Sequence, residues 1–374
     1  MSLLQKLRIR NVRNLAEANL LPSERVNLFY GLNGSGKTSV LEAIHVLALG
    51  RSFRSRLFSS VVRLGEEEAV VYGRVARDNV GHELGVAKAL GGDSRYRLDG
   101  GTITSIADMA VLLPVVLLVP ETFELLNGGP KERRQFLDWG VFHVEHGYLE
   151  HWRNYQRSLK QRNSLLRRGR IDGRQLAVWD EHLVRYGDLI DAARRRYLDL
   201  LEPRVREMLA AFQFETAQIR IDYARGWGKD RSLADVLADS RDRDIASGRT
   251  MAGPHRCDLR LTVQGLDARD HLSRGQQKIV ICALKLAQGA CLAELTNQAS
   301  VYLIDDLHAE LDEANAQVFC RLLEQLQTQV FITALNKDAA SHYWSPDLPL
   351  KMFHVEQGSI NEVPLRTSEE FLTK

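Results

Sequence analysis

The residues best suited to chemistry lie near the N-terminus, where glycines precede a lysine and a threonine. They form the frame Gly31-x-x-x-x-Gly36-Lys37-Thr38, between an apolar run at 26–30 and a segment with helical apolar spacing. This is the P-loop pattern, in which backbone N–H groups and a helix N-terminus surround phosphate oxygens. The expected nucleotide-binding residues are Gly31, Leu32, Asn33, Gly34, Ser35, Gly36, Lys37, Thr38 and Ser39.

A pair of carboxylates late in the chain supplies the second half of this chemistry. The apolar run at 301–304 ends in Asp305 and Asp306, the arrangement of a Walker B strand. Adjacent carboxylates at a buried strand end repel each other unless a cation lies nearby, which disfavours a purely structural role. We expect Thr38 and Asp305 to be metal ligands for Mg²⁺. We expect Asp306 and Lys37 to be catalytic, acting on the attacking water and on the β- and γ-phosphates.

A short polar segment opens the longest apolar helix predicted in the chain, from 279 to about 295. It contains Ser273, Arg274, Gly275 and Gln276. A serine N-cap followed by glycine makes a helix start that can bind an anion. Taken alone, this short pattern is weak evidence for an anion-binding site.

Composition indicates an ordinary globular protein. The chain has 374 residues, enough for two domains, with 44% apolar and 26% charged residues. The net charge of +2 does not by itself indicate a nucleic-acid binder. Four cysteines form no C-x-x-C pair, which fits a reducing cytosol. No signal peptide is recognisable, and the longest apolar run, 109–119, is too short to span a bilayer. We expect a cytoplasmic protein with no membrane partner.

The element pattern divides the chain into three parts. Alternating strands are predicted at 3–30 and 69–104, and a buried strand at 111–119 that ends before Glu121. Helical periodicity dominates from 131 to about 212, where Gly169 and Gly173 separate the helices of a hairpin. The α/β character returns at Gly253. The expected parts are 1–127, 128–252 and 253–374.

The helical hairpin carries the densest basic run. Between Arg153 and Arg174 the only acidic residue is Asp172. A solvated helix face is the usual explanation for charged runs, but a run of one sign favours contact with a phosphate backbone. The candidate DNA-binding residues are Arg153, Arg157, Lys160, Arg167 and Arg168.

The order of these motifs resembles the RecF family of ABC-type ATPases over nearly the whole chain. The P-loop, L-S-R-G-Q, Asp-Asp and a following Leu-Asp occur in the order of an ABC-type head. The segments that carry the resemblance are 31–38, 50–54, 130–138, 253–256, 273–278 and 305–312.

The resemblance implies an α/β fold: a P-loop ABC-type ATPase head, with a mixed sheet and an antiparallel subdomain, plus an inserted helical lobe. It also implies ATP and Mg²⁺ as cofactors and an ATP-dependent homodimer, in which the signature residues Ser273, Arg274, Gly275 and Gln276 act in trans. A single P-loop and a single signature agree with a symmetric dimer. The expected D-loop residues are Glu310, Leu311 and Asp312.

Family membership further implies DNA binding at gaps and at junctions of single- and double-stranded DNA. RecR and RecO would be partners in loading RecA during recombinational repair and the SOS response. The expected activity is a weak, DNA-stimulated ATPase. The alternatives are a nucleotide-sensing scaffold with little turnover and an ABC transporter ATPase subunit. An SMC-type chromosome organiser is disfavoured, because a helix of 30 residues spans only about 45 Å.

Some positions depart from the pattern of transporter ATPases. Arg274 stands where transporters usually have glycine, and Asp306 stands where they have glutamate. The last core strand ends in Thr333 instead of histidine. Glu121 is a weak candidate for the glutamine expected after the strand at 111–119. Participation of Thr333 and of Glu121 in the nucleotide site is left open.

Overall fold

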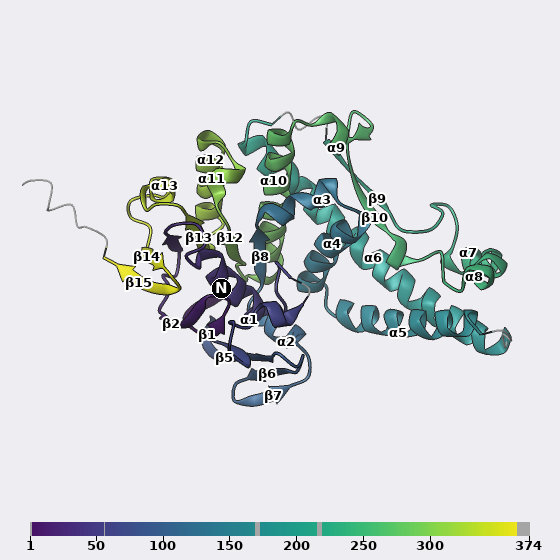
Figure 1. Cartoon of the computed structure of the whole chain (residues 1–374). Helices are drawn as coiled ribbons and strands as arrows, with labels where there is room; N and C mark the ends of the chain where they lie inside the picture. Colours follow the sequence, from purple (N-terminus) through teal and green to yellow (C-terminus); the bar gives the residue numbers. More distant parts are fainter. Residues whose placement is uncertain (1, 56, 169–172, 215–218, 365–374) are drawn as a thin grey trace, which may run out of the picture. The chain divides into compact units, whose positions relative to one another are not determined.

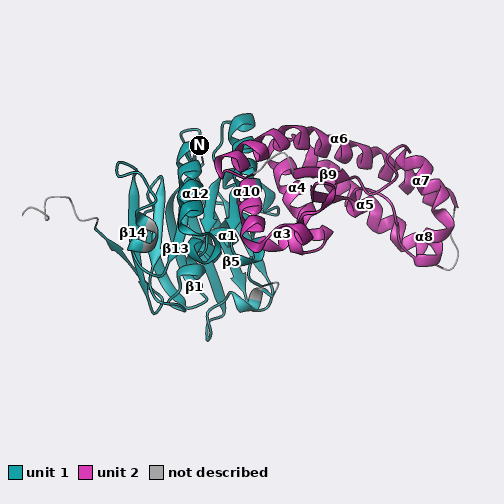
Figure 2. Cartoon of the chain, turned by 90° about the horizontal axis from the view of Figure 1, so that it is seen from above, with its two compact units in different colours: residues 1–122, 284–374 teal, residues 123–283 magenta. Residues whose placement is uncertain are grey.

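The computed structural model describes residues 2–55, 57–168, 173–214 and 219–364, with the element order shown in Figure 1. The chain forms two compact units (Figure 2), residues 1–122 with 284–374, and residues 123–283. The expected boundaries at 127/128 and 252/253 both lie inside the second unit. The strand at 258–263 belongs there because its hydrogen-bonded neighbours are β9 and β11 of the same unit.

The first unit contains a six-stranded sheet of order β15-β14-β3-β13-β12-β8. All its pairings are parallel except that of β15 with β14. β12 and β13 are buried along their whole length, as expected of central parallel strands covered on both faces. The strands are β3 (Val26–Tyr30), β8 (Val115–Leu118), β12 (Val301–Ile304), β13 (Gln329–Ala334), β14 (Leu350–Glu356) and β15 (Ser359–Val363).

The first unit also contains an antiparallel sheet of order β2-β1-β4-β5-β6-β7. Buried and exposed residues alternate along its strands, so one face packs on the core and the other faces solvent. This sheet is the antiparallel subdomain that the sequence predicted. Its strands are β1 (Leu3–Val12), β2 (Leu15–Leu20), β4 (Glu68–Arg77), β5 (Val80–Ala89), β6 (Ser94–Leu98) and β7 (Gly101–Ile103).

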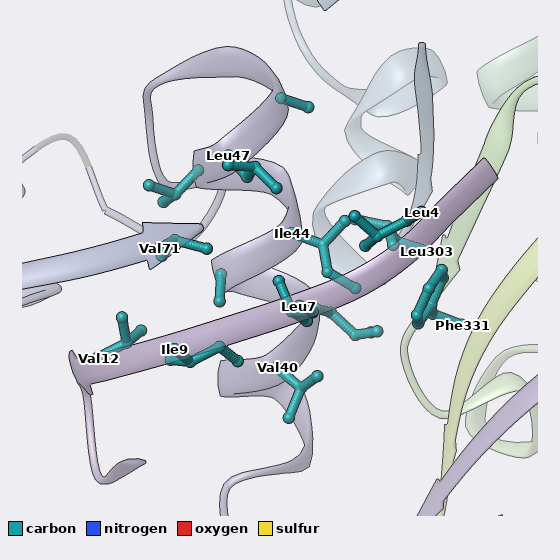
Figure 3. Packing of buried hydrophobic residues seen from close by; sticks show 14 of the residues in the cluster. Leu4, Leu7, Ile9, Val12, Val40, Ile44, Leu47, Val71, Leu303 and Phe331 are labelled. Atoms are coloured by element: carbon teal, nitrogen blue, oxygen red, sulfur yellow. The ribbon is translucent and has the colours of Figure 1, made fainter. Parts of the chain in front are cut away.

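Helix α1 (Lys37–Leu49) joins the two sheets into one hydrophobic core. Figure 3 shows Leu7 of β1 beside Val40 and Ile44 of α1, with Leu303 and Phe331 of the parallel sheet in the same cluster. All of these side chains are at most 1% exposed. Each buried leucine, isoleucine or valine contributes about 1.5–3 kcal/mol relative to an exposed one. The core therefore fixes the helix that follows the P-loop.

The remaining helices of the first unit are short, and one of them corrects a prediction. Val111 lies in α2 and is exposed, so the strand predicted at 111–119 begins only at Val115. Pro114 explains the difference, because a proline disfavours helical backbone at the residue before it. These helices are α2 (Ala107–Leu112), α11 (Leu307–Glu310), α12 (Glu313–Gln325) and α13 (Asp338–Ser341).

The second unit contains the predicted helical hairpin, formed by α5 and α6. The residues predicted between these helices, 169–172, lie outside the described part of the chain. Leu183, Ile190 and Tyr197 recur every seven residues along α6 and are buried, so they lie on one apolar face of the helix. The helices are α3 (Glu124–Asn127), α4 (Pro130–Val144), α5 (Tyr148–Leu166), α6 (Gly173–Ala211), α7 (Leu233–Asp239), α8 (Arg241–Ser247) and α9 (Ala268–His271). The strands are β9 (Ile219–Ala224), β10 (Asp258–Val263) and β11 (Leu266–Asp267).

Helix α10 (Arg274–Thr296) begins in the second unit and ends in the first. Within the described residues it is the only helix long and apolar enough to cross a membrane. Most of that apolar stretch is buried inside the protein, which is typical of a core helix. The finding is weak evidence for a membrane span.

Candidate nucleotide-binding site

The P-loop connects β3 to α1 and closes around the side chain of Lys37. Gly34 and Gly36 have φ angles of 77° and 121°, which favour glycine. The ammonium of Lys37 donates to the carbonyl oxygens of Gly31 and Leu32, at 2.7 and 3.0 Å. Burial lowers the pKa of Lys37, while the nearby carboxylates of the Asp305–Asp306 pair oppose that shift. The loop thus holds a cation at the start of a helix, where an anion is favoured.

The structure brings Asp305 to the beginning of α1. Asp305 follows β12, and the Thr38 hydroxyl lies 3.0 Å from both of its carboxylate oxygens. The contact spans 267 positions in sequence, and it arises because β12 and β3 run parallel in the same sheet. A hydroxyl and a carboxylate are the hard oxygen donors that Mg²⁺ prefers. The two residues present therefore fit a magnesium site.

Thr333 binds both members of the acid pair. Its hydroxyl donates to Asp305 Oδ1 at 2.7 Å and accepts the backbone N–H of Asp306 at 2.9 Å. Asp306 has a φ angle of 50°, which is uncommon for a residue other than glycine. Because the single hydroxyl proton of Thr333 goes to Asp305, this side chain orients the Asp305 carboxylate and holds the backbone of Asp306.

Asn14 also binds the P-loop, and no local pattern in the sequence predicts this contact. Its amide donates to the carbonyl oxygens of Gly34 and Ser35, at 3.2 and 2.9 Å. Its own oxygen accepts a hydrogen bond from the hydroxyl of Ser39 at 3.0 Å. Alternating strands around positions 13 and 14 predicted a turn, but not where its tip would lie.

Arg13, also missed, binds a carboxylate on α1. Glu42 is fully buried and accepts two hydrogen bonds from Arg13, each 2.8 Å long. Ser52 donates to the same carboxylate at 2.5 Å, and a guanidinium nitrogen of Arg54 lies 3.9 Å away. A buried carboxylate is tolerated when it is paired in this way. Glu42 thereby attaches the loop after α1, which contains Ser52 and Arg54, to the helix that follows the P-loop.

Asn14, Lys37, Thr38 and Asp305 line one cleft of about 960 Å³ in the first unit. Its wall includes Asp306 and Thr333, while Glu121 is not among its described lining residues although its neighbour Pro120 is. The positive charge comes from arginines as well as from the P-loop lysine. The cationic lining residues are Arg13, Lys37, Arg54 and Arg63.

The predicted signature lies in the second unit, at the start of α10. The backbone N–H of Ser273 donates to the side chain of Gln276 at 2.9 Å, and the N–H of Gln276 donates to the Ser273 hydroxyl at 3.3 Å. This reciprocal pair is a capping box. The residues Ser273, Arg274, Gly275 and Gln276 are all exposed.

The other predicted residues are found on short segments and on one helix face. In the predicted D-loop, Glu310 ends α11, Leu311 is buried, and Asp312 caps α12 by accepting the N–H of Asn315 at 2.9 Å. The predicted DNA-binding residues are all exposed. Arg153, Arg157 and Lys160 share one face of α5, whereas Arg167 and Arg168 follow its end.

The basic run needs one correction, at Arg162. This side chain is fully buried. It is paired with Asp180 at 2.5 Å and with Asp244 at 2.6 Å. It stabilises the second unit and is not available to phosphates.

A model of the RecF/RecN/SMC N-terminal domain matches residues 3–361 of the chain. The DNA replication and repair protein RecF of Pseudomonas syringae pv. tomato is 45% identical over 360 residues, covering 96% of this chain and 98% of the relative. The chain belongs to the RecF family. RecF of Azotobacter vinelandii is 47% identical to this RecF-family protein over 360 residues, with the same coverage of both chains.

Solved structures agree with this assignment. A structure described as the recombination mediator RecF with ATP in the RecFOR pathway has a TM-score of 0.86 and 29% identity. That comparison covers 97% of this RecF-family chain and 98% of the other. An SMC head bound to a ScpA domain has a TM-score of 0.60 and 15% identity, over 99% of each chain, and so shows the same fold. The predicted family and ABC-type ATPase fold are confirmed.

Proposed function

We propose that this protein is an ATP-binding DNA replication and repair protein that hydrolyses ATP slowly. The observation that carries the proposal is the meeting of Thr38, Asp305 and Lys37 in one cleft at the start of α1. These groups come from the beginning and the end of the chain. The family assignment and the likeness to a RecF–ATP structure support the same conclusion.

In this proposal each residue of the cleft has a distinct role. The backbone N–H groups of the P-loop and the Lys37 ammonium bind the β- and γ-phosphates of ATP. Asp306 orients the attacking water and accepts its proton. Thr38 and Asp305 would hold Mg²⁺, which when bound supplies positive charge to the phosphates.

A second part of the proposal concerns assembly. Two copies of the chain would associate when ATP is bound, and the signature residues of one copy would contact the nucleotide of the other. The exposed start of α10, with Ser273, Gly275 and Gln276, supports this arrangement, because its capping box leaves a helix N-terminus open to an anion. One P-loop and one signature in each chain favour a symmetric homodimer.

The proposed cellular role follows the family. The protein would act in the cytoplasm on gapped DNA or on junctions of single- and double-stranded DNA. With RecR and RecO it would promote RecA loading in recombinational repair and the SOS response. The solved RecF–ATP structure is described as part of the RecFOR pathway. The exposed cations Arg153, Arg157 and Lys160 on α5 remain candidates for DNA contacts.

ATP hydrolysis, measured with and without gapped DNA, tests this proposal. We expect DNA to stimulate hydrolysis, and Asp306→Asn to lower it by about 10²–10⁴-fold, the usual contribution of a general base. Asp347→Asn is the matched control, because it makes the same substitution at an exposed carboxylate outside the lining of the cleft and should keep the wild-type rate. Wild-type hydrolysis in Asp306→Asn would contradict the assigned role. A rate of ATP hydrolysis that gapped DNA does not change would favour a nucleotide-sensing scaffold.

A further inference from the structure

The solvent face of the antiparallel sheet carries an unusual excess of positive charge. Along β1, Lys6, Arg8 and Arg10 project from this face, because Leu7 and Ile9 between them are buried. The strands β1, β4, β5 and β6 that build the face are hydrogen-bonded neighbours. The cations on this face are Lys6, Arg8, Arg10, Arg74, Arg95 and Arg97, and its carboxylates are Glu17, Glu68 and Glu83.

Most of these cations have no carboxylate partner. Arg95 pairs with Glu68. Among the described residues, no acidic group lies within ion-pair distance of the other five. Lys6 lies directly across from Arg74 in the ladder of β1 and β4, and like charges at such positions destabilise a sheet. The positive charge therefore stays available to a partner.

The strand register places Arg8 and Arg97 at the two ends of one row across the sheet. Arg8 pairs with Tyr72, Tyr72 with Gly85, and Gly85 with Arg97. Three strand spacings separate the two arginines, about 14 Å. The Arg8 guanidinium lies 5.9 Å from the centre of the Tyr72 ring. Gly85 and the neighbouring Ala87 are small, so the middle of the face stays flat.

Tyr72 adds no negative charge to this row. Burial and a hydrogen bond to Glu83 raise the pKa of its hydroxyl, so the ring stays neutral at physiological pH. Beside it, a hollow of about 540 Å³ between β1 and β2 is lined in part by Lys6 and Arg8. The face thus carries the Glu83 carboxylate beside a neutral ring at its centre, and the cations surround them.

We propose that this sheet face, centred on Lys6, Arg8 and Arg97, is a docking surface for the phosphate backbone of duplex DNA. The proposal rests on the proposed function, to which it adds a location for the DNA. The separation of Arg8 and Arg97 is close to the width of the major groove, about 12 Å, so their side chains can reach phosphates on both sides of one groove. Phosphate contacts of this kind position a protein on DNA without reading its sequence.

A duplex fits this surface better than an acidic protein does. The cations on β1 repeat every second residue, about 6.6 Å apart, along a straight line. A regular row of like charges complements a polyanion of regular spacing. The large apolar or aromatic side chains that dominate protein interfaces are few on the described face: Tyr72 near its centre and the exposed Leu21 at its edge.

The test is the salt dependence of duplex DNA binding by the full chain, measured with a slowly hydrolysed ATP analogue present. The variant combines Lys6→Gln, Arg8→Gln and Arg97→Gln. Each lost phosphate contact lowers the slope of log K against log salt by about 0.9. The slope of the triple variant should therefore be lower by about 2.7, and this variant should bind DNA more weakly. The matched control combines Arg204→Gln, Arg206→Gln and Arg231→Gln, exposed arginines whose own carboxylate partners lie beside them.

The outcomes separate this inference from the proposed function. A shallower slope in the Lys6/Arg8/Arg97 variant, with nucleotide binding unchanged, supports the docking surface. An unchanged slope overturns it, and would leave the α5 face or an acidic protein partner as the alternative. A wild-type chain that binds nucleotide but no DNA overturns both proposals. If the triple variant loses nucleotide binding through misfolding, the single variants Arg8→Gln and Arg97→Gln replace it. Each should lower the slope of log K against log salt by about 0.9.

Discussion

At the scale of single residues, the Thr333 hydroxyl binds the carboxylate of Asp305 and the backbone of Asp306. Its proton is donated to Asp305, and its oxygen accepts the backbone N–H of Asp306. Transporter ATPases place a histidine at the end of this strand, and the sequence left open whether Thr333 takes part in the nucleotide site. The hydrogen-bond geometry supports a positioning role for Thr333.

Replacing Thr333 by valine tests this role. Thr333→Val keeps the shape but removes a hydrogen bond to a charged group, which contributes about 1.5–3 kcal/mol. We expect the Mg²⁺ concentration needed for half-maximal ATP binding to rise by about tenfold or more. Thr333→Ser keeps the hydroxyl and should restore the wild-type requirement. The measurement is fluorescence titration of a labelled ATP analogue with magnesium, and equal requirements in all three proteins would refute the role.

At the scale of elements, buried polar contacts hold the helical hairpin to the turn at 254–256. Arg194 of α6 is fully buried and donates to Asp138 of α4 at 2.7 Å and to the carbonyl of Pro254 at 2.9 Å. Tyr155 of α5 lies 2.7 Å from His255 Nδ1, and His255 Nε2 lies 3.1 Å from the carbonyl of Thr250. The Thr250 carbonyl needs a proton on Nε2, and in the neutral ring Nδ1 then accepts the hydrogen bond of the Tyr155 hydroxyl.

This arrangement predicts a loss of stability in mild acid. Burial lowers the pKa of His255 to about 4, from an ordinary value of 6.5. Below pH 6.5 the unfolded chain binds a proton at this ring and the folded chain does not, so the free energy of unfolding falls as the pH drops from 6.5 to 4. One pKa unit corresponds to 1.36 kcal/mol, so the loss is about 2–3 kcal/mol at pH 4.

Urea unfolding at several pH values measures this effect. His45, whose pKa burial also lowers to about 4, contributes a loss of the same sign. Burial also lowers the pKa of His308. His255→Gln removes one of these rings, and the pH dependence between 6.5 and 4 should become less steep. A variant with the full wild-type pH dependence would show that His255 titrates in the folded state as it does in the unfolded chain.

At the scale of the whole molecule, the P-loop and the signature belong to different compact units of the chain. The P-loop cleft is lined by residues of the first unit, while Ser273 and Gln276 start α10 in the second. This separation is compatible with the proposal that a second copy of the chain completes each nucleotide-binding site. ATP binding would then control association.

The variant Lys37→Ala tests this coupling. Without the ammonium that contacts the phosphates, ATP should no longer promote dimers, and sedimentation should show only monomers at ATP concentrations that dimerise the wild-type chain. Lys351→Ala is the control, since it removes a lysine that contacts Leu21 and Glu362 away from the cleft. Normal ATP-dependent dimers in Lys37→Ala would contradict the role of the P-loop in assembly.

The sequence by itself determined the local chemistry of this protein. Glycine spacing before Lys37, the apolar strand before Asp305 and the serine N-cap at Ser273 are patterns of neighbouring residues. Each is dictated by backbone conformation and side-chain chemistry within about ten positions, so the P-loop, the acid pair, the helix starts and the antiparallel strands could all be predicted. The family resemblance depended on the order of the same local motifs.

Only the tertiary structure decided which distant groups meet. The support of the P-loop by Asn14, the binding of Asp305 by Thr333 and the burial of Arg162 depend on sheet order and helix packing, which no local pattern encodes. The same is true of the basic face around Arg8, because residues on different strands share a face only once the register is set. In a charged run such as 153–174, some residues are buried and others are exposed. The neighbouring helix decides which, because burial depends on three-dimensional neighbours and not on composition.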